Sequence, residues 1–165
     1  MLRSVVVMAV VARHSRRVGV RGLASAAADA RAPRQMPLRR VLFNVPGSDQ
    51  RKIDKALTSL DLDTLVLDLE DGVAANMKAD ARERVRSTLL ARAPGLQPLA
   101  TGRRPELLVR INSIGSGLEA DDLRVMADTV RNAGALDAIV VPKVGRVLQA
   151  RSIDHVAETW RRFCS

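Results

Sequence analysis

Four short apolar segments alternate with four longer segments of helical periodicity between residues 41 and 163. The short segments stop at turn-forming or polar residues, whereas the longer ones carry apolar residues at spacings of three and four. This alternation predicts an α/β fold with a parallel sheet and right-handed crossovers. The expected strands are 41–45, 64–69, 106–111 and 138–141, and the expected helices are 50–60, 78–92, 118–132 and 147–163.

The second expected strand is a nearly continuous apolar run, which predicts burial on both faces. It ends in three carboxylates, Asp68, Glu70 and Asp71, followed by Gly72. Acids crowded at the end of a buried strand are costly unless a cation or a polar ligand offsets their charge. Because ligands bind at the carboxyl ends of parallel strands, we predict a functional site here. The alternative is a solvated loop with a helix-capping acid.

The other three expected strands also end in polar loops, which gather at the same edge of a parallel sheet. These loops are Pro46-Gly47-Ser48-Asp49, Arg110-Ile111-Asn112-Ser113 and Pro142-Lys143. Such an arrangement is typical of a (β/α)8 barrel, which takes roughly 250 residues. The chain therefore accounts for about the first four βα units, a half barrel. We expect a half barrel to expose Val and Leu on its inward face and to leave edges open on its first and fourth strands.

Charge is concentrated in the first 40 residues, which hold nine arginines and one acid, Asp29, for a net charge of +8 out of a total of +9. The nearly neutral remainder has no basic patch with aromatic residues, so a nucleic-acid partner is not expected. Residues 1–35 resemble a disordered mitochondrial leader, with a candidate cleavage site at Arg21–Ser25. A secretory signal, with Ser4–Ala12 as its apolar core, and an extension without an address are the alternatives.

Two further features limit the possible environments of the chain. The single Cys164 has no partner for an internal disulfide, which favours a reducing compartment. No apolar run approaches the roughly 18 residues of a membrane span, so no membrane partner is expected. We therefore predict a leader at 1–35, a folded domain at 38–165 and a mitochondrial location.

Four blocks of the domain resemble the HpcH/HpaI aldolase and citrate lyase beta-subunit superfamily, and its branch of mitochondrial citrate lyase beta-like proteins (citramalyl-CoA lyases) is the most similar. The blocks cover residues 40–144, the N-terminal half of the family domain. They are Arg40–Asp49 followed by Lys52 and Lys55, Leu67–Asn76 followed by Lys78, Ala81 and Arg82, Val109–Ser113 followed by Ser116–Leu118 and Asp121–Leu123, and Val141–Val144.

The resemblance implies a TIM barrel, usually trimeric, that uses Mg²⁺ to cleave carbon–carbon bonds in 3-hydroxyacyl-CoA thioesters. It implies an acyl-CoA substrate, such as citramalyl-CoA going to acetyl-CoA and pyruvate, and a homo-oligomer if the barrel is completed. The acids Asp68, Glu70 and Asp71 would form the catalytic wall, with Glu70 and Asp71 reaching the metal through water. The residues implied in substrate binding are Pro46, Lys52, Arg110, Asn112 and Lys143.

Departures from the family pattern change this expectation. The family's two direct metal ligands, a Glu and an Asp, lie on later strands, beyond Lys143, so we expect no direct metal ligand and no activity from these 165 residues alone. Asn44 and Gly145 replace the family's usual aromatic residue and Glu. The explanations left open are a truncated gene model, an alternative transcript and a diverged half.

The main alternative function is a non-catalytic half barrel that self-associates or binds a full-length paralogue. A serine hydrolase has little support, because no His and acid constellation accompanies Ser48. A doubly wound nucleotide-binding domain lacks the Gly-x-Gly-x-x-Gly fingerprint. Malyl-CoA and a citryl thioester remain open as substrates.

Overall fold

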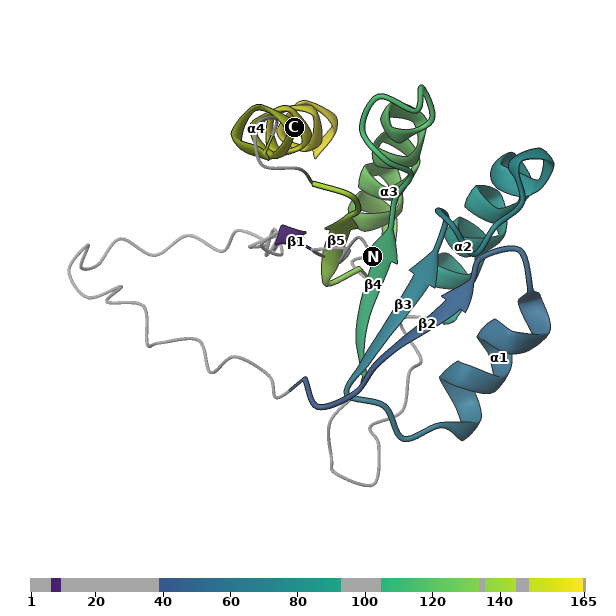
Figure 1. Cartoon of the computed structure of the whole chain (residues 1–165). Coiled ribbons are helices and arrows are strands. Elements are labelled where there is room, and N and C mark those ends of the chain that lie inside the picture. Colours follow the sequence, from purple (N-terminus) through teal and green to yellow (C-terminus); the bar gives the residue numbers. More distant parts are fainter. Residues whose placement is uncertain (1–6, 10–38, 93–104, 134–135, 145–148, 165) are drawn as a thin grey trace, which may run out of the picture.

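The sheet of this α/β chain has five strands in the order β1-β5-β4-β3-β2 (Figure 1). The computed structural model describes residues 7–9, 39–92, 105–133, 136–144 and 149–164. Strands β2 to β5 are parallel, and each leads into a helix. The elements are β1 Val7–Ala9, β2 Leu42–Pro46, α1 Gln50–Ser59, β3 Thr64–Asp68, the 3₁₀ turn η1 Ala75–Met77, α2 Lys78–Arg92, β4 Glu106–Arg110, α3 Glu119–Ala133, β5 Ala138–Val141 and α4 Gln149–Cys164.

This order confirms the predicted α/β class and the four successive βα units of a TIM-barrel-type sheet. The bounds of α2 and β5 are as predicted, and the other predicted elements differ from the structure by at most two residues at an end. Asp49 accepts a hydrogen bond from the N–H of Lys52 and caps the start of α1. None of the described helices is both long and apolar enough to cross a lipid bilayer.

Strand β1 lies within the expected leader and was not predicted. Residues Val7–Ala9 pair antiparallel with β5, with Val7 opposite Val141. The physical reason is that the edge of β5 offers unpaired backbone groups, which an apolar, β-prone segment can satisfy. The rest of the expected leader and the candidate cleavage site lie outside the described residues, so the division at 1–35 stays a prediction.

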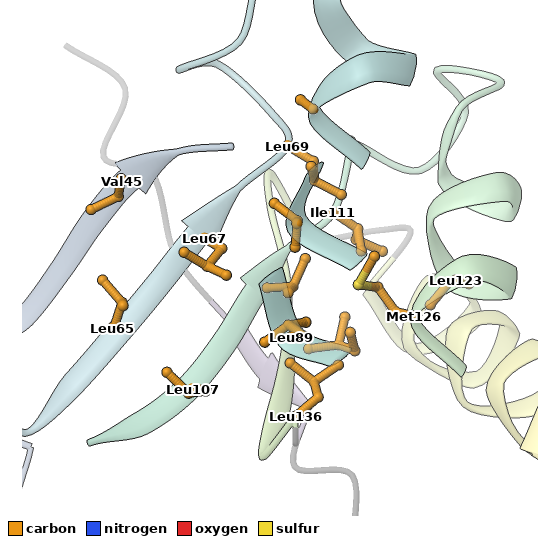
Figure 2. Packing of buried hydrophobic residues seen from close by; sticks show 14 of the residues in the cluster. Val45, Leu65, Leu67, Leu69, Leu89, Leu107, Ile111, Leu123, Met126 and Leu136 are labelled. Atoms are coloured by element: carbon orange, nitrogen blue, oxygen red, sulfur yellow. The ribbon is translucent and has the colours of Figure 1, made fainter. Parts of the chain in front are cut away.

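Helices α1 to α4 cover one face of the sheet (Figure 1) and build the main core there, part of which is shown in Figure 2. Strand residues of odd number, such as Leu65, Leu67 and Val109, point to this face because side chains alternate along a strand. They meet helix residues including Leu89, Leu123 and Met126, all buried. The core therefore fixes which residues of each strand point away from the helices.

The second face of the sheet is buried at β3, β4 and β5, where Val and Leu of an inward face were expected to be exposed. Its apolar residues, Val66, Leu108, Ala138 and Val140, are at most 2% exposed. These four residues of three neighbouring strands form one apolar cluster, so the expectation of a bare inward face is wrong there. It holds at Leu42, which lies on the same face of β2 and is 41% exposed.

Two arginines counted with the basic leader belong to the folded domain. The Arg39 guanidinium donates to both carboxylate oxygens of Glu106 at 2.6 and 2.7 Å, and Arg40 donates to Asp63 in the same two-point manner. Glu106 and Asp63 lie at the N-terminal ends of β4 and β3. These pairs attach the segment that leads into β2 to the N-terminal ends of the neighbouring strands, opposite the end that carries the candidate site.

Candidate functional site

The parallel register brings the predicted site residues together at the carboxyl ends of the strands. Asp68, the last residue of β3, lies opposite Pro46 of β2 on one side and Arg110 of β4 on the other. Arg110 is in turn opposite Val140, three residues before Lys143. Asp68 and Arg110 have even numbers, so they project from the face opposite the helices.

Asp68 and Arg110 form a two-point ion pair. Arg110 Nε donates to Oδ1 and Nη2 donates to Oδ2, each at 2.7 Å. The N–H groups of Glu70 and Gly72 complete the acceptor set at 2.8 Å each. Burial pushes the pKa of Asp68 upward, but the bonds from Arg110 and from the two backbone N–H groups outweigh it and the pKa is lowered. The hydrogen bond to Asp68 raises the pKa of Arg110.

Glu70 is the buried acid of the cluster that keeps spare acceptor capacity. Its Oε1 accepts from the Ser113 hydroxyl at 2.8 Å and lies 2.9 Å from Lys143 Nζ. Its Oε2 lies 3.1 Å from Arg110 Nη1 but has no hydrogen-bond partner. Among the described residues, it is the one buried side-chain oxygen or nitrogen atom that lacks such a partner. Lys78 Nζ donates to the carbonyl oxygens of Leu69 and Glu70, which fixes the backbone beneath this carboxylate.

Lys143 bridges the two acids that follow β3. Its Nζ contacts Glu70 and also donates to Asp71 Oδ1 at 2.8 Å, and these bonds, the one to Asp71 foremost, raise its pKa. The backbone φ of Lys143 is +52°, a left-handed conformation that non-glycine residues rarely adopt. Such strain clusters at functional sites. Asp71 itself is largely exposed.

Asn112 is held by a buried carboxylate on α3 that the sequence did not mark as part of the site. Asp122 is fully buried and accepts from the N–H of Asn112 at 2.8 Å and from its Nδ2 at 2.7 Å. Arg82 of α2 donates to the other oxygen of Asp122 at 2.7 Å. The bonds to Asp122 orient the start of the loop that carries Ser113.

Two glycines let the loops approach Asp68. A Cβ on Gly72 would come within 2.5 Å of Asp68 Oδ2, and one on Gly47 would come within 2.9 Å of the Asp68 carbonyl oxygen. The N–H of Gly47 donates to that carbonyl at 2.8 Å. The glycine after the three acids is thus needed for the two-point pair to form.

The structure brings most, but not all, of the predicted site residues together. Asp68, Glu70, Asp71, Arg110 and Lys143 form one cluster of ion pairs. Pro46 adjoins it through its register with Asp68. Asn112 is directed to Asp122, and Lys52 pairs with Asp49 in its own helix turn, with 64% of its side chain exposed. The substrate role predicted for these residues stays a prediction.

Ser113, Lys78 and Asp122 are the members of the site that residue chemistry alone did not single out. Ser113 follows Asn112 in the loop after β4. This position at a strand end was the feature of the sequence that could have identified it as a site residue. Lys78 and Asp122 lie in the first turns of α2 and α3, where charged residues are ordinarily read as surface groups.

The described residues do not fit a direct Mg²⁺ site. Mg²⁺ demands near-octahedral oxygen coordination with one or two direct carboxylates. No group of three or more His, Cys, Asp or Glu in the described ranges is placed to hold a metal ion. Both oxygens of Asp68 are engaged by Arg110, and Lys143 lies between Glu70 and Asp71. Glu70 Oε2 has no hydrogen-bond partner and Asp71 is largely exposed, so both acids can still accept a hydrogen bond from water.

A family model described as HpcH/HpaI aldolase/citrate lyase matches residues 39–163. The chain is 40% identical over 109 residues to the mitochondrial citramalyl-CoA lyase of Homo sapiens, covering 66% of this chain and 28% of that protein. It is 35% identical over 124 residues to an L-malyl-CoA/beta-methylmalyl-CoA lyase of Cereibacter sphaeroides, covering 74% of this chain and 35% of that one. The chain thus spans about a third of the length of the curated relatives it matches.

Among solved structures, the chain is similar to a citrate lyase beta subunit from M. tuberculosis complexed with oxaloacetate and magnesium. The identity is 34% and the TM-score 0.38, over 52% of this chain and 32% of that one. A second structure, the protein CitE from the same organism in complex with magnesium, acetoacetate and coenzyme A, is 21% identical with a TM-score of 0.39, over 77% of this chain and 63% of that one.

Proposed function

The chain belongs to the HpcH/HpaI aldolase/citrate lyase family, and on that premise we propose that it serves a Mg²⁺-dependent carbon–carbon lyase acting on a 3-hydroxyacyl-CoA. Citramalyl-CoA, cleaved to acetyl-CoA and pyruvate, is the preferred substrate, because three mammalian relatives of 40–43% identity carry that activity in their names. Those names also include "mitochondrial", which supports the location proposed from the basic leader.

The observation that carries the proposal is the placement of Arg110 among the acids at the strand ends. A guanidinium has five N–H donors in a fixed fork. Two of them bind Asp68, and the side chain remains 21% exposed. The fork is therefore held in one orientation and keeps donors for a substrate carboxylate or thioester oxygen.

Of the three acids proposed as catalytic, Glu70 is the best placed to hold or move a proton. In the cleavage, the hydroxyl proton leaves, the carbon–carbon bond breaks toward the thioester, and the resulting enolate takes up a proton to give acetyl-CoA. Asp68 is saturated by four donors, which suits a positioning role. Glu70 is buried and has an oxygen without a hydrogen-bond partner. Mg²⁺, when bound, would stabilise negative charge on substrate oxygens, with direct ligands from outside the described residues.

Because the described residues offer no direct metal site, we expect these 165 residues alone to be inactive. Citramalyl-CoA is incubated with the chain and excess Mg²⁺, and acetyl-CoA and pyruvate are measured. Turnover clearly above a buffer blank would overturn this part of the proposal.

Substrate binding is tested separately by calorimetric titration of the chain with citramalyl-CoA. Arg110→Met is expected to weaken binding at least tenfold, whereas the exposed helix residue Arg131 serves as a matched control through Arg131→Met. Equal binding by both variants would refute the role of Arg110. Absence of binding by the unaltered chain would refute a substrate site built from the described residues.

The second candidate function is the non-catalytic half barrel that self-associates or binds a full-length paralogue. One observation favours it: β2 lies at the edge of the sheet, and the three apolar residues at its start, Val41–Phe43, are exposed. Contiguous exposed apolar surface on a folded chain usually marks an interface.

A further inference from the structure

Helix α2 carries two basic residues on the stripe of its surface that faces the core. The apolar members of this stripe, Ala81, Val85 and Leu89, are at most 2% exposed. Lys78 and Arg82 stand three positions before Ala81 and Val85, and residues three and four apart share one face of a helix. Only 12% of the Arg82 side chain is exposed. Burying a charge is costly unless it is paired, so the contacts of these two residues indicate what they hold.

Lys78 holds the loop after β3. Its Nζ donates to the carbonyl oxygens of Leu69 and Glu70 at 2.7 and 2.5 Å. Hydrogen bonds from a charged donor are stronger than those between neutral groups. Lys78 therefore fixes the backbone that carries the Glu70 carboxylate.

Arg82 holds the loop after β4 through α3, the helix that lies next to α2 (Figure 1). Its Nε donates to Asp122 Oδ1 at 2.7 Å, and Oδ2 of the same carboxylate accepts from the N–H and Nδ2 of Asn112. Both the backbone and the side chain of Asn112 are thereby fixed. The next residue, Ser113, donates its hydroxyl to Glu70 Oε1 at 2.8 Å.

The later part of the β4 loop is held by weaker contacts. Glu119 accepts from the N–H of Gly115 and from the Ser116 hydroxyl, at 3.1 Å each, in hydrogen bonds that are exposed to solvent. Water competes for exposed bonds of a charged group. A Cβ on Gly115 would meet no atom of the described residues within 4 Å. The position of Ser113 is therefore determined mainly by the buried bonds at Asp122.

We propose that Arg82 is a positioning residue for Glu70, although the bonds between the two run through other residues. The guanidinium of Arg82 fixes the Asp122 carboxylate, which in turn fixes Asn112. Ser113 is then placed to engage one oxygen of Glu70. A buried polar network of this kind, with each member bonded to the next, rigidifies the groups at its end.

Helix α2 thus acts on Glu70 from two sides. Lys78 holds its backbone, and Arg82, one turn later, acts on its carboxylate through the loop after β4. Oε1 is engaged, and Oε2 has no hydrogen-bond partner among the described residues. An acid that exchanges a proton with a bound substrate needs such a fixed geometry. This inference rests on the first proposed function, in which Glu70 holds or moves a proton.

Carbon NMR of the full 165-residue chain tests this connection without a ligand. The five glutamates are labelled with ¹³C at Cδ, and the Glu70 signal is assigned from its loss in Glu70→Gln. Arg82→Met is expected to shift the Glu70 signal by more than its line width, because the Ser113 hydroxyl then meets Oε1 in a different geometry. If Arg82 contributed to stability alone, the signal of Glu70 in the folded chain would stay in place.

Arg86→Met is the matched control. Arg86 also lies on α2 and also pairs with an acid, Glu83, at 2.8 Å. Its replacement should shift the Glu83 signal and leave the Glu70 signal unchanged. A Glu70 signal that Arg82→Met leaves in place, or that both variants shift alike, would overturn the proposal.

Arg82→Lys covers the case in which Arg82→Met does not fold. Lysine keeps the charge but not the fork of the guanidinium, so the Glu70 signal should again shift, by less than in Arg82→Met. If Arg82→Met does not fold, an unchanged Glu70 signal in Arg82→Lys overturns the proposal. The spectra are recorded without substrate, so a lack of lyase activity would refute the first proposed function but not the placement of Glu70 by Arg82.

Discussion

Replacing Asp68 by Asn removes one charge from the two-point pair while keeping the size of the side chain. Each oxygen of Asp68 accepts from one nitrogen of Arg110 and from one backbone N–H, those of Glu70 and Gly72. An amide keeps only one oxygen. Whichever way the amide is turned, one guanidinium donor and one backbone donor therefore lose their acceptor.

The cost follows from the burial of these donors. A buried donor without an acceptor costs about 1–3 kcal/mol. Arg110 is partly exposed and can regain a bond to water, so its share lies at the low end. We expect Asp68→Asn to lower the free energy of unfolding by about 2–4 kcal/mol, a large part of the roughly 5–15 kcal/mol of a typical domain.

The pH dependence distinguishes a lost ion pair from a general packing defect. Because the folded state lowers the pKa of Asp68 below its ordinary 3.8, the pair stabilises the protein above that pH. This stability is lost as the pH falls through the folded-state pKa. Asp68→Asn has no such group to titrate. The difference in the free energy of unfolding between this variant and the unaltered chain should therefore become smaller in acid.

Urea unfolding monitored by circular dichroism and by fluorescence of Trp160, the single tryptophan, measures the effect. Asp128→Asn is the matched control, since Asp128 also accepts a bond from an arginine, Arg131, but at a site where both side chains are 45% exposed. It should barely move the midpoint. A loss below about 0.5 kcal/mol for Asp68→Asn, or a gap that does not change with pH, would refute the reasoning.

Three further predictions follow from the contacts around the site, each checked by urea or thermal unfolding. Asp122→Asn should lower the free energy of unfolding by about 2–4 kcal/mol because a fully buried acceptor is lost. Asp121→Asn, at the exposed neighbouring position, should change it by less than about 0.5 kcal/mol. Equal effects would contradict the role of the bonds that Asp122 accepts. Gly72→Ala should cost about 1–3 kcal/mol by crowding Asp68, and more than Gly115→Ala, which has open space but a φ of +86°. Lys143→Gly should have a higher melting temperature than Lys143→Ala, because glycine tolerates the φ of +52°. The reverse order would show that the backbone at residue 143 is not strained.

The sequence was sufficient to predict the four parallel strands, but not β1, and the edge at which the site lies. Apolar periodicity separated strands from helices, and turn residues marked where each strand stops. Polar residues at the strand ends then placed Asp68 and Arg110 at one edge of the sheet. What periodicity does not determine is register between strands, because any even shift keeps the same faces. That Asp68 lies directly opposite Arg110, and binds it at two points, emerged only from the fold.

Burial at a helix start was the second quantity that could not be predicted. Asp122 lies in the acidic first turn of α3, a pattern typical of a solvated helix start. It is buried because the end of β4 presents Asn112 to it. By contrast, the exposed residues at the start of β2 agree with the open edge expected for the first strand, because β2 is the last strand of the sheet. Both outcomes depend on neighbours remote in sequence.

The ion pairs also divide the acids of the site by role. Asp68, Glu70 and Asp71 carry three negative charges, and Arg110 and Lys143 supply two positive ones, which leaves a formal charge of −1. Asp68 has no acceptor capacity left, and Asp71 is largely exposed to water. The buried oxygen without a hydrogen-bond partner therefore belongs to Glu70. Substitution of Asp68 should therefore lower mainly the free energy of unfolding. Substitution of Glu70 should instead weaken the binding of a ligand that donates a hydrogen bond to the site.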